Sequence, residues 1–404
     1  MSSKAQALIT LKRMKILYDD NMPFAAECFS LLGDAQAFDA RSITPHDLDD
    51  VDALIVRSTL SVTPDLLAFA SQLKWVATAT AGFNHLDTAY LENNGIRWSS
   101  AAGCNAVAVA EYVVSTLFNC VRDEEDPLHA LQTKTVGIVG AGHVGSALAE
   151  KLTALAIPFC LCDPPLEDTH DPRAFVTLND AVRCDFVCLH VPYESDGEYA
   201  TKNLLNAQIL NNMMPSQVII NACRGGVVDE AAFLHQSNTQ PDRCPQLILD
   251  AWQGEPNINV ELLARIAMGS AHIAGHSIEG KARGTFMAYA ELCRLLDKNL
   301  KLRLSDVLHQ LEPIVLSAAE LDDPSTLPRL IFSLYDMSHD DRLLRSAMAQ
   351  SDSPASAFVA LRKHYAVRRE FSAQPLIVPH HLLQAKTVHR LRLLGFPCSD
   401  TDLN

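Results

Sequence analysis

Three side chains in the second half of the sequence have the types needed for hydride chemistry on a hydroxy acid. Arg224 lies in NACRGGVVDE, Glu255 in DAWQGEP and His272 in AHIAGHS. An imidazole can take the proton of a hydroxyl group near neutral pH. A carboxylate can orient that imidazole, and a planar guanidinium can bind a substrate carboxylate through two hydrogen bonds. Together they could oxidise a C2 hydroxyl with a nicotinamide as hydride acceptor.

Each of these residues also has a structural interpretation when it is considered alone. His272 could be a hydrogen-bonded core residue, and Glu255 before Pro256 could begin a helix, where acidic side chains are favourable. Arg224 before two glycines could lie in a surface turn. Their combination downstream of a nucleotide-binding motif favours the catalytic interpretation.

That motif is the glycine pattern in GIVGAGHVGS, residues 137–146. Gly140, Gly142 and Gly145 form G-x-G-x-x-G between an apolar strand-like run and the helical SALAEKLTAL. The first glycine permits a tight turn, the second lets the backbone approach a pyrophosphate, and the third lets helix and strand pack closely. Backbone amides at the start of the helix, at His143 and Val144, would face the phosphates. The alternative is a glycine-rich turn without a ligand.

An acidic residue stands where a dinucleotide site needs one. Asp163 ends the apolar run FCLC that follows the helix. A carboxylate at this position can bind both ribose hydroxyls and would repel a 2′-phosphate, so NAD is favoured over NADP. Residues 1–104 contain no such fingerprint, and we expect them to form the substrate-binding half.

Short apolar runs predict the strands that would position these residues. In the first half they are residues 15–18, 53–56 and 75–80, with helical spacing at 23–32. A long apolar segment at 105–120 without proline or glycine predicts a buried helix. Further strands are expected at 135–139, 159–163, 186–191, 218–221 and 247–250. Strands and helices that alternate at these intervals indicate parallel sheets, whose carboxyl ends carry the ligand-binding residues.

Composition excludes several classes of protein. The 404 residues suggest two or three domains, and 48% hydrophobic residues with 20% charged residues indicate a globular chain with a sizeable core. The 33 lysines and arginines against 48 acidic residues give a net charge of −15. This balance argues against a nucleic-acid or anionic-membrane binder, although a few local cations could still hold a small anion.

Cysteines and targeting signals favour a cytoplasmic protein. The 11 cysteines are an odd number without a disulfide or zinc framework, and several lie inside apolar runs, so we expect buried reduced thiols. No apolar run has the length of a transmembrane helix, and the first residues do not resemble a signal peptide. We expect residues 1–13 to be a disordered extension.

The chain resembles the D-isomer-specific 2-hydroxyacid dehydrogenases. The stretches that carry the resemblance are GIVGAGHVGS, NACRGGVVDE, DAWQGEP and AHIAG. The resemblance implies two Rossmann-like doubly wound domains, a split substrate domain and an inserted NAD-binding domain, plus a C-terminal helical or α+β dimerisation domain. The expected boundaries are residues 14–104 for the first substrate part, 105–284 for the NAD domain, 285–303 for the return segment and 304–404 for the tail.

The same resemblance implies roles for individual residues. Arg224, Glu255 and His272 would be the catalytic set, with His272 as the acid/base. Substrate contacts would come from Ser58, Thr80 and His276. NAD contacts would come from the glycine loop and from Asp163, Val191, Ala222, Cys223, Asp250 and Gly275. Three departures affect the details: His276 stands where a tyrosine is usual, Val191 replaces a common threonine, and Phe83-Asn84 precede His85 where an acid is usual.

Two further interpretations concern metal and phosphate. His272 and His276 are four residues apart, but Gly275 and the lack of a nearby third ligand argue against a metal site. The substrate is expected to be a small phosphorylated 2-hydroxy acid. Its phosphate would bind Arg57 and Lys281, with Arg283 as a further candidate, and with the basic cluster at 362–369 as another if a dimer partner brings it near. The cluster could equally be a solvated basic face.

Two other functions stay open at this point. One is a related 2-hydroxyacid dehydrogenase acting on 3-phosphoglycerate or hydroxypyruvate. A dehydrogenase of 3-phosphoglycerate, however, more often carries a βαβ-type regulatory tail. The other is an NAD-sensing binding protein on the same fold, because fold alone does not decide function. The complete Arg–Glu–His set favours an enzyme, and we expect a homodimer.

Overall fold

The computed structural model describes residues 13–400, and contacts within the chain divide it into two compact units. The first unit combines the residues up to Cys104 with Lys281–Leu308, and the second combines Asn105–Gly280 with the residues from His309 onward. Each unit is therefore built from two separate stretches of chain. Apart from Arg13, the extension expected at residues 1–13 lies outside the described residues.

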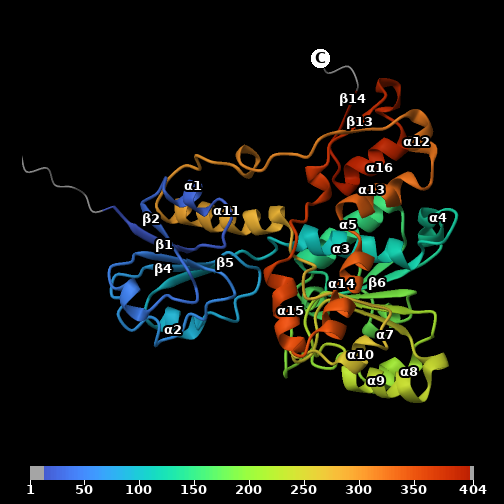
Figure 1. Cartoon of the computed structure of the whole chain (residues 1–404), viewed down its shortest axis with the longest axis horizontal. Coiled ribbons are helices and arrows are strands. Elements are labelled where there is room, and N and C mark those ends of the chain that lie inside the picture. Colours follow the sequence, from blue (N-terminus) through green and yellow to red (C-terminus); the bar gives the residue numbers. More distant parts are fainter. Residues whose placement is uncertain (1–12, 401–404) are drawn as a thin grey trace, which may run out of the picture. The chain divides into compact units, whose positions relative to one another are not determined.

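The first unit contains a parallel sheet with the strand order β2-β1-β3-β4-β5 (Figure 1). The three inner strands confirm the predicted ones, whereas the two edge strands carry polar, partly exposed sequences (DAQAF and RWSS) that gave no strand signal. The bounds are β1 Lys15–Asp19, β2 Asp34–Phe38, β3 Ala53–Val56, β4 Trp75–Thr78 and β5 Arg97–Ser100.

Helices α1 (Ala25–Phe29), α2 (Thr88–Asn93) and α11 (Ile278–Leu295) supply the helical part of this unit, α11 from Lys281 onward. Phe29 of α1 and Tyr289 of α11 meet edge to face, with ring centroids 6.5 Å apart. Both side chains belong to an apolar cluster that also contains Ile16 of β1. The return segment of the chain thus completes the core of the first unit.

The second unit contains a parallel sheet with the order β11-β10-β9-β8-β6-β7. Strand β6 lies between β7 and β8, so the strand order reverses there, which is where open α/β sheets bind their ligands. All five predicted strands are confirmed, and the two-residue β11 was not predicted. The bounds are β6 Val136–Val139, β7 Phe159–Cys162, β8 Phe186–Leu189, β9 Val218–Asn221, β10 Gln246–Leu249 and β11 Met268–Gly269.

The long apolar segment is confirmed as the buried helix α3, Ala106–Cys120, which packs on α5, His143–Leu155. Val113 and Leu117 of α3 and Leu148 of α5 are completely buried in the largest apolar cluster of the protein. The remaining helices around this sheet are short: α4 Pro127–Gln132, α6 Pro164–Asp168, α7 Leu178–Ala181, α8 Ala207–Asn212, α9 Glu230–Thr239 and α10 Val260–Leu263.

The C-terminal part of the second unit is α+β. Its three parallel strands are β12 Ile314–Val315, β13 Leu376–Val378 and β14 Cys398–Asp400, in the order β12-β13-β14. Its helices are α12 Ala318–Asp322, α13 Thr326–Leu334, α14 Met337–Gln350, α15 Pro354–Lys363 and α16 Lys386–Leu394. Figure 1 shows α16 beside α5, and their residues share one apolar cluster. This region therefore packs directly on the dinucleotide-binding fold.

A buried ion pair lies at this junction. Lys151 of α5 contacts Glu111 of α3 at 2.9 Å and donates to the carbonyl of Leu394 at 2.8 Å. Glu111 also accepts a hydrogen bond from the backbone N–H of Phe371 at 3.0 Å. Burial raises the pKa of Glu111 to about 7, against the lowering effect of Lys151. In the folded protein Glu111 keeps its proton up to about pH 7, whereas in the unfolded chain it loses the proton near the lower, ordinary pKa of a glutamate. The folded state therefore loses stability relative to the unfolded state as the pH rises from that ordinary pKa to about 7.

Removing the cation should expose this dependence. We expect Lys151→Met to lower the free energy of unfolding by about 3 kcal/mol at pH 8, because an unpaired carboxylate stays buried. The loss should be smaller at pH 5, where Glu111 takes up a proton. The measurement is urea unfolding at both pH values. Lys134→Met, which removes a more exposed pair with Asp185, is the control and should cost less than about 1 kcal/mol. Equal losses in the two variants would contradict this account.

Candidate active site

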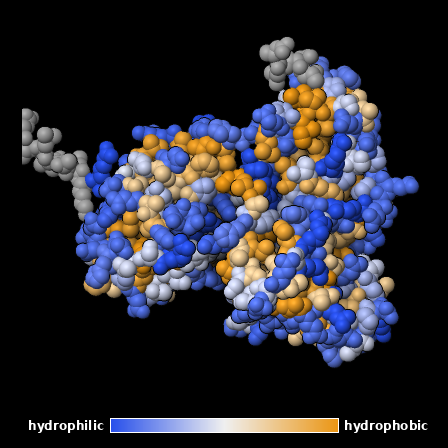
Figure 2. Space-filling view, in the orientation of Figure 1, coloured by the Kyte–Doolittle hydropathy of each residue, from blue (hydrophilic) through white to orange (hydrophobic). Residues whose placement is uncertain are grey.

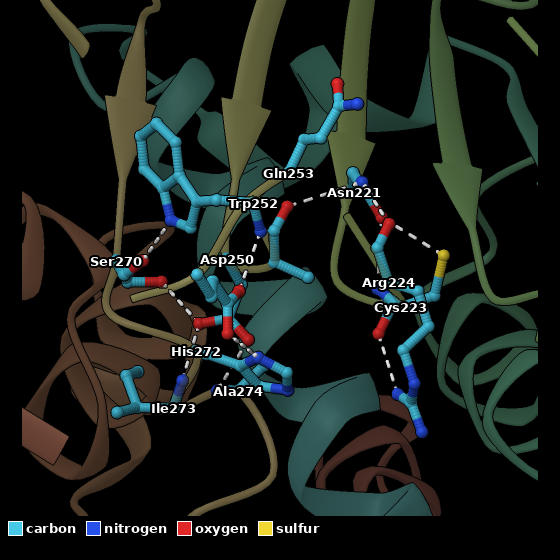
Figure 3. Close-up of polar contacts among 12 residues, drawn as sticks. Asn221, Cys223, Arg224, Asp250, Trp252, Gln253, Ser270, His272, Ile273 and Ala274 are labelled. Carbon is cyan, nitrogen blue, oxygen red and sulfur yellow. Dashed lines mark hydrogen bonds and ion pairs between the residues drawn. The ribbon is translucent and has the colours of Figure 1, made fainter. Parts of the chain in front are cut away.

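The loop that carries His272 is organised by Asp250, directly after β10. The Asp250 side chain accepts hydrogen bonds from Ser270 Oγ at 2.7 Å, from the N–H of Ile273 at 2.6 Å and from that of Ala274 at 3.0 Å (Figure 3). His272 has a φ of 55°, which non-glycine residues seldom adopt and which needs support from surrounding contacts. Its own N–H donates to the Asp250 carbonyl at 2.9 Å.

His272 is paired with Glu255, as the sequence predicted. Nδ1 of the imidazole lies 2.8 Å from Oε2 of Glu255, and Oε1 accepts from the N–H of Trp252 at 2.8 Å. Because a carboxylate oxygen only accepts, Nδ1 is the donor of this bond. Nε2 is then the ring nitrogen with a lone pair for a substrate proton. The indole of Trp252 in turn donates to the carbonyl of Ser270 at 2.8 Å, which ties the two loops together.

Arg224 extends from the loop after β9. Asn221, at the end of that strand, donates to the carbonyl of Arg224 at 2.9 Å and accepts from the N–H of Cys223 at 3.1 Å. A side chain at Gly225 would meet the carbonyl oxygen of Trp252 at 2.0 Å, so glycine is needed where the loops after β9 and β10 touch. The Arg224 guanidinium is exposed, and its Nη1 donates to the carbonyl of Cys223 at 2.8 Å.

The glycine loop has the shape that a dinucleotide requires. Gly140 has a φ of 94°, and a Cβ there would come within 2.6 Å of the carbonyl oxygen of His190. A Cβ at Gly145 would lie 2.1 Å from the carbonyl oxygen of Gly140, which explains the close packing of helix on strand. Nothing lies within 4 Å of the Cβ position at Gly142, which leaves the backbone at the start of α5 open to approach. The residues therefore fit a bound pyrophosphate.

Asp163 lies at the end of β7, next to this loop. Its Oδ2 accepts from the N–H of Ala141 at 2.8 Å, and its Oδ1 caps α6 through the N–H of Leu166 at 3.1 Å. Arg173, which the sequence analysis missed, donates to the carbonyl of Ala141 at 2.9 Å and is held by Asp171. Arg173 lies in a loop between the short helices α6 and α7, where no sequence pattern indicates a contact with the glycine loop.

The remaining cofactor candidates lie after the neighbouring strands. Val191 is the second residue after β8, and Ala222 and Cys223 come directly after β9. A Cβ at Gly275 would meet Nδ2 of Asn105, at the start of α3, at 2.4 Å. Asp250 is used internally by the loop around His272. Direct contact of these residues with NAD stays a prediction.

His190, immediately after β8, is a polar residue that the sequence analysis missed. Neither ring nitrogen has a hydrogen-bond partner within residues 13–400, and burial lowers the pKa of this imidazole to about 4. The ring is therefore neutral at physiological pH. Its place in the apolar run FVCLHV, beyond the strand end, was the available signal.

Four of the five residues proposed to contact the substrate, namely Ser58, Thr80, Arg57 and Lys281, belong to the first unit. Ser58 is exposed after β3, and Thr80 Oγ1 donates to the carbonyl of Gly82 at 2.9 Å. Burial lowers the pKa of Arg57 and of Lys281, and the positive charge of Arg57 lowers the pKa of Lys281 further. The two cations therefore repel each other within one unit, and an anion bound to both would relieve that repulsion.

His276 lies in the second unit beside the C-terminal region, with its ring centroid 5.9 Å from that of Tyr365. Within the described residues, no group of three or more histidine, cysteine or acidic side chains is arranged to hold a metal ion. Arg283 donates to the carbonyl of Cys104, so this cation takes part in the internal structure of the first unit.

The open side of Gly142 leads to a prediction. Gly142→Ala should leave the melting temperature unchanged, because its φ of −68° suits alanine and no atom lies nearby. The new methyl group should nevertheless weaken NAD binding by at least about tenfold, because it stands where the backbone must approach the pyrophosphate. NAD titration by calorimetry measures this effect. Gly145→Ala, which clashes with backbone, should instead lower the melting temperature, and unchanged NAD affinity in Gly142→Ala would refute the assignment.

Comparisons with known proteins identify the family and the fold of this chain. Residues 105–276 match the model of the D-isomer specific 2-hydroxyacid dehydrogenase NAD binding domain, and residues 309–395 match a domain of unknown function (DUF3410). Solved structures share the fold at low identity. D-lactate dehydrogenase of Aquifex aeolicus, complexed with NAD and lactic acid, has 20% identity and a TM-score of 0.54 over 70% of this chain and 95% of its own. NAD-bound 3-phosphoglycerate dehydrogenase of Entamoeba histolytica has 19% identity and a TM-score of 0.58 over 73% and 100%.

Relatives with higher identity cover almost the whole chain. Erythronate-4-phosphate dehydrogenase of Pseudoalteromonas atlantica is 45% identical over 361 residues, which are 89% of this chain and 94% of the relative. The enzyme of the same name from Pectobacterium atrosepticum is 42% identical over 387 residues, 96% of this chain and 99% of the relative. The chain therefore belongs to the erythronate-4-phosphate dehydrogenases, within the D-isomer-specific 2-hydroxyacid dehydrogenase family.

Proposed function

We propose that this protein oxidises 4-phospho-D-erythronate to 2-oxo-3-hydroxy-4-phosphobutanoate with NAD, as a step in pyridoxal 5′-phosphate biosynthesis. The observation that carries the chemistry is the 2.8 Å contact between His272 Nδ1 and Glu255 Oε2, in the same unit as the dinucleotide loop. The relatives' shared name supplies the substrate.

The residues of this chain handle the proton and the substrate charge. His272 Nε2 takes the proton of the C2 hydroxyl as the C2–H bond breaks, and Glu255 stabilises the resulting imidazolium. Glu255 also fixes the ring orientation, because its second oxygen is held by the N–H of Trp252. Arg224 binds the substrate carboxylate and polarises the C2 oxygen with its exposed guanidinium. NAD, when bound to the glycine loop and Asp163, supplies the hydride acceptor.

The substrate phosphate requires further cations, because carboxylate and phosphate together carry about three negative charges at neutral pH. Arg57 and Lys281 are our candidates. Desolvation and mutual repulsion lower the pKa of Lys281, and the attraction of a bound dianion would offset both effects. Ser58 and Thr80 are proposed to contact the substrate with their hydroxyl groups, and His276 with its imidazole.

We propose that the protein is a cytoplasmic homodimer. The eleven cysteines are free thiols, and no helix of residues 13–400 is long and apolar enough to cross a membrane. Large apolar side chains are exposed on the C-terminal region, including Leu343, Val359 and Val367, the last 78% exposed. Apolar areas are visible over this part of the second unit in Figure 2. A partner molecule would cover such a surface.

A substrate panel tests the proposed activity. Purified protein is mixed with NAD, with and without a 2-oxo acid as a possible acceptor of the electrons. The substrates are 4-phosphoerythronate, 3-phosphoglycerate and glycerate. We expect turnover of 4-phosphoerythronate with the highest kcat/KM, and a loss of at least about 100-fold in kcat for His272→Gln. Turnover of 3-phosphoglycerate alone would favour the related dehydrogenase, and NAD binding without any turnover would favour an NAD-sensing protein.

The phosphate assignment is tested separately. Arg57→Glu should raise the KM for 4-phosphoerythronate at least about tenfold more than the KM for erythronate, which lacks the phosphate. Arg41→Glu is the matched control, because this exposed arginine forms its ion pair with the nearby Asp39. Steady-state kinetics with both substrates provides the comparison. Equal changes in the two KM values would rule out Arg57 as a phosphate ligand.

A further inference from the structure

A segment of the C-terminal region runs alongside the loop that carries His272. We call residues 365–371 the strap and residues 270–280 the catalytic loop. Ser277 forms a parallel bridge with Arg368, and the N–H of Ile278 donates to the carbonyl of Arg368 at 3.0 Å. The ring of Tyr365 packs against that of His276. The strap and the catalytic loop are thus joined through backbone and side chains.

Arg368 reaches from the strap to the backbone of the catalytic loop. Its Nη1 donates to the carbonyl of Ala274 at 2.9 Å and its Nη2 to the carbonyl of Ala108 in α3 at 2.6 Å. The guanidinium lies over the ring of Tyr335, 3.9 Å from the centroid. The residue is only 4% exposed. A buried cation with two carbonyl acceptors and an aromatic face is a structural clamp rather than part of a solvated basic surface.

Glu370 of the strap and Glu279 of the catalytic loop add further contacts between these two segments. Ser277 Oγ donates to Glu370 Oε1 at 2.8 Å, and the N–H of Glu370 donates to Glu279 Oε2 at 3.0 Å. Arg369 binds Glu279 Oε1 at 2.6 Å. The far end of the strap is held by Glu111, which accepts from the N–H of Phe371. The strap is therefore fixed to α3 independently of its contacts with the catalytic loop.

Two hydrogen bonds that hold the catalytic loop meet at Ala274, close in sequence to His272. Asp250 holds the N–H of Ala274 from one side, and Arg368 holds its carbonyl from the other. Ala274 is two residues from His272, whose φ of 55° persists only while its surroundings enforce it. Loss of the outer contact would let the turn relax and move the imidazole away from Glu255.

We propose that Arg368 is a positioning residue, which holds the catalytic loop so that His272 keeps its pairing with Glu255. This proposal rests on the proposed function of His272 as the base. It assigns a role in the reaction to the C-terminal region apart from dimer formation. It also gives Arg368, one member of the basic cluster at residues 362–369, an internal function in place of phosphate binding.

The test compares Arg368→Met and Arg368→Lys with a matched control, Arg122→Met. Arg122, just after the end of α3, also contacts the C-terminal region, through Asp336 at 2.6 Å and the ring of Phe332, and its hydrogen bonds and ion pair do not involve the catalytic loop. The measurements on the full-length protein are steady-state kinetics with 4-phosphoerythronate, the melting temperature, and amide hydrogen exchange of peptides that cover residues 272–280.

We expect Arg368→Met to lower kcat on the order of 10- to 100-fold, because a small displacement of the base is costly, while the KM for NAD stays within about twofold. Exchange at residues 272–280 should become faster, and Arg368→Lys should recover part of both losses because it keeps the charge. Arg122→Met, which removes a more exposed ion pair, should lower the melting temperature less and should produce neither effect.

Two results would overturn the proposal. One is unchanged exchange at residues 272–280 in Arg368→Met, or in Arg368→Lys if the methionine variant does not fold. The other is a fall in kcat in Arg368→Met that is no larger than the fall in Arg122→Met. If the wild-type protein does not turn over 4-phosphoerythronate, the proposed function fails, and the exchange measurement alone upholds or overturns the positioning role.

Discussion

The carboxylate of Asp250 is 2% exposed, and burying it is costly unless its oxygens are hydrogen-bonded. Three donors meet this need, and all three come from residues 270–274. The turn therefore has one geometry that satisfies the buried charge, and that geometry places His272 in the left-handed region with its ring toward Glu255. The Glu255 loop is fixed in the same network, since Trp252 joins the Glu255 carboxylate to the carbonyl of Ser270. The pairing of His272 with Glu255 thus depends on Asp250, a residue for which the sequence resemblance implied only a cofactor contact.

The sheet of the second unit explains why the other groups lie near one another. Its strands are parallel, so their carboxyl ends share one edge, and the functional candidates follow these ends in turn. Gly140 follows β6, Asp163 follows β7, and Arg224 comes shortly after β9. Gly225 then allows the loops after β9 and β10 to touch. Side chains that are distant in sequence become neighbours because of strand direction and close backbone contact.

Much of this arrangement could be predicted from the sequence, for identifiable reasons. Inner strands such as β3 and β8 are continuous apolar runs because both faces of a parallel sheet are buried. The glycine loop has fixed spacing because each glycine meets backbone or leaves a surface open. The edge strands β2 and β5 were missed because their polar residues lack that signal, and β11 because two residues carry no periodicity.

Long-range polar contacts were the least predictable part of the site. Arg368 reads as one of several basic residues near the end of the chain, and its sequence neighbours do not reveal that its acceptors are Ala274 and Ala108. Arg173 and His190 were missed for the same reason. Their environment is set by tertiary packing and not by local pattern.

The distance in sequence between Arg368 and Ala274 has a consequence for synthesis of the protein. All strands of the dinucleotide-binding sheet have been translated by residue 269, but the outer contact of the catalytic loop comes from a segment that leaves the ribosome much later. A nascent chain that has already formed its glycine loop still lacks this contact. Full ordering of the loop around His272 therefore has to wait until the last translated region has docked.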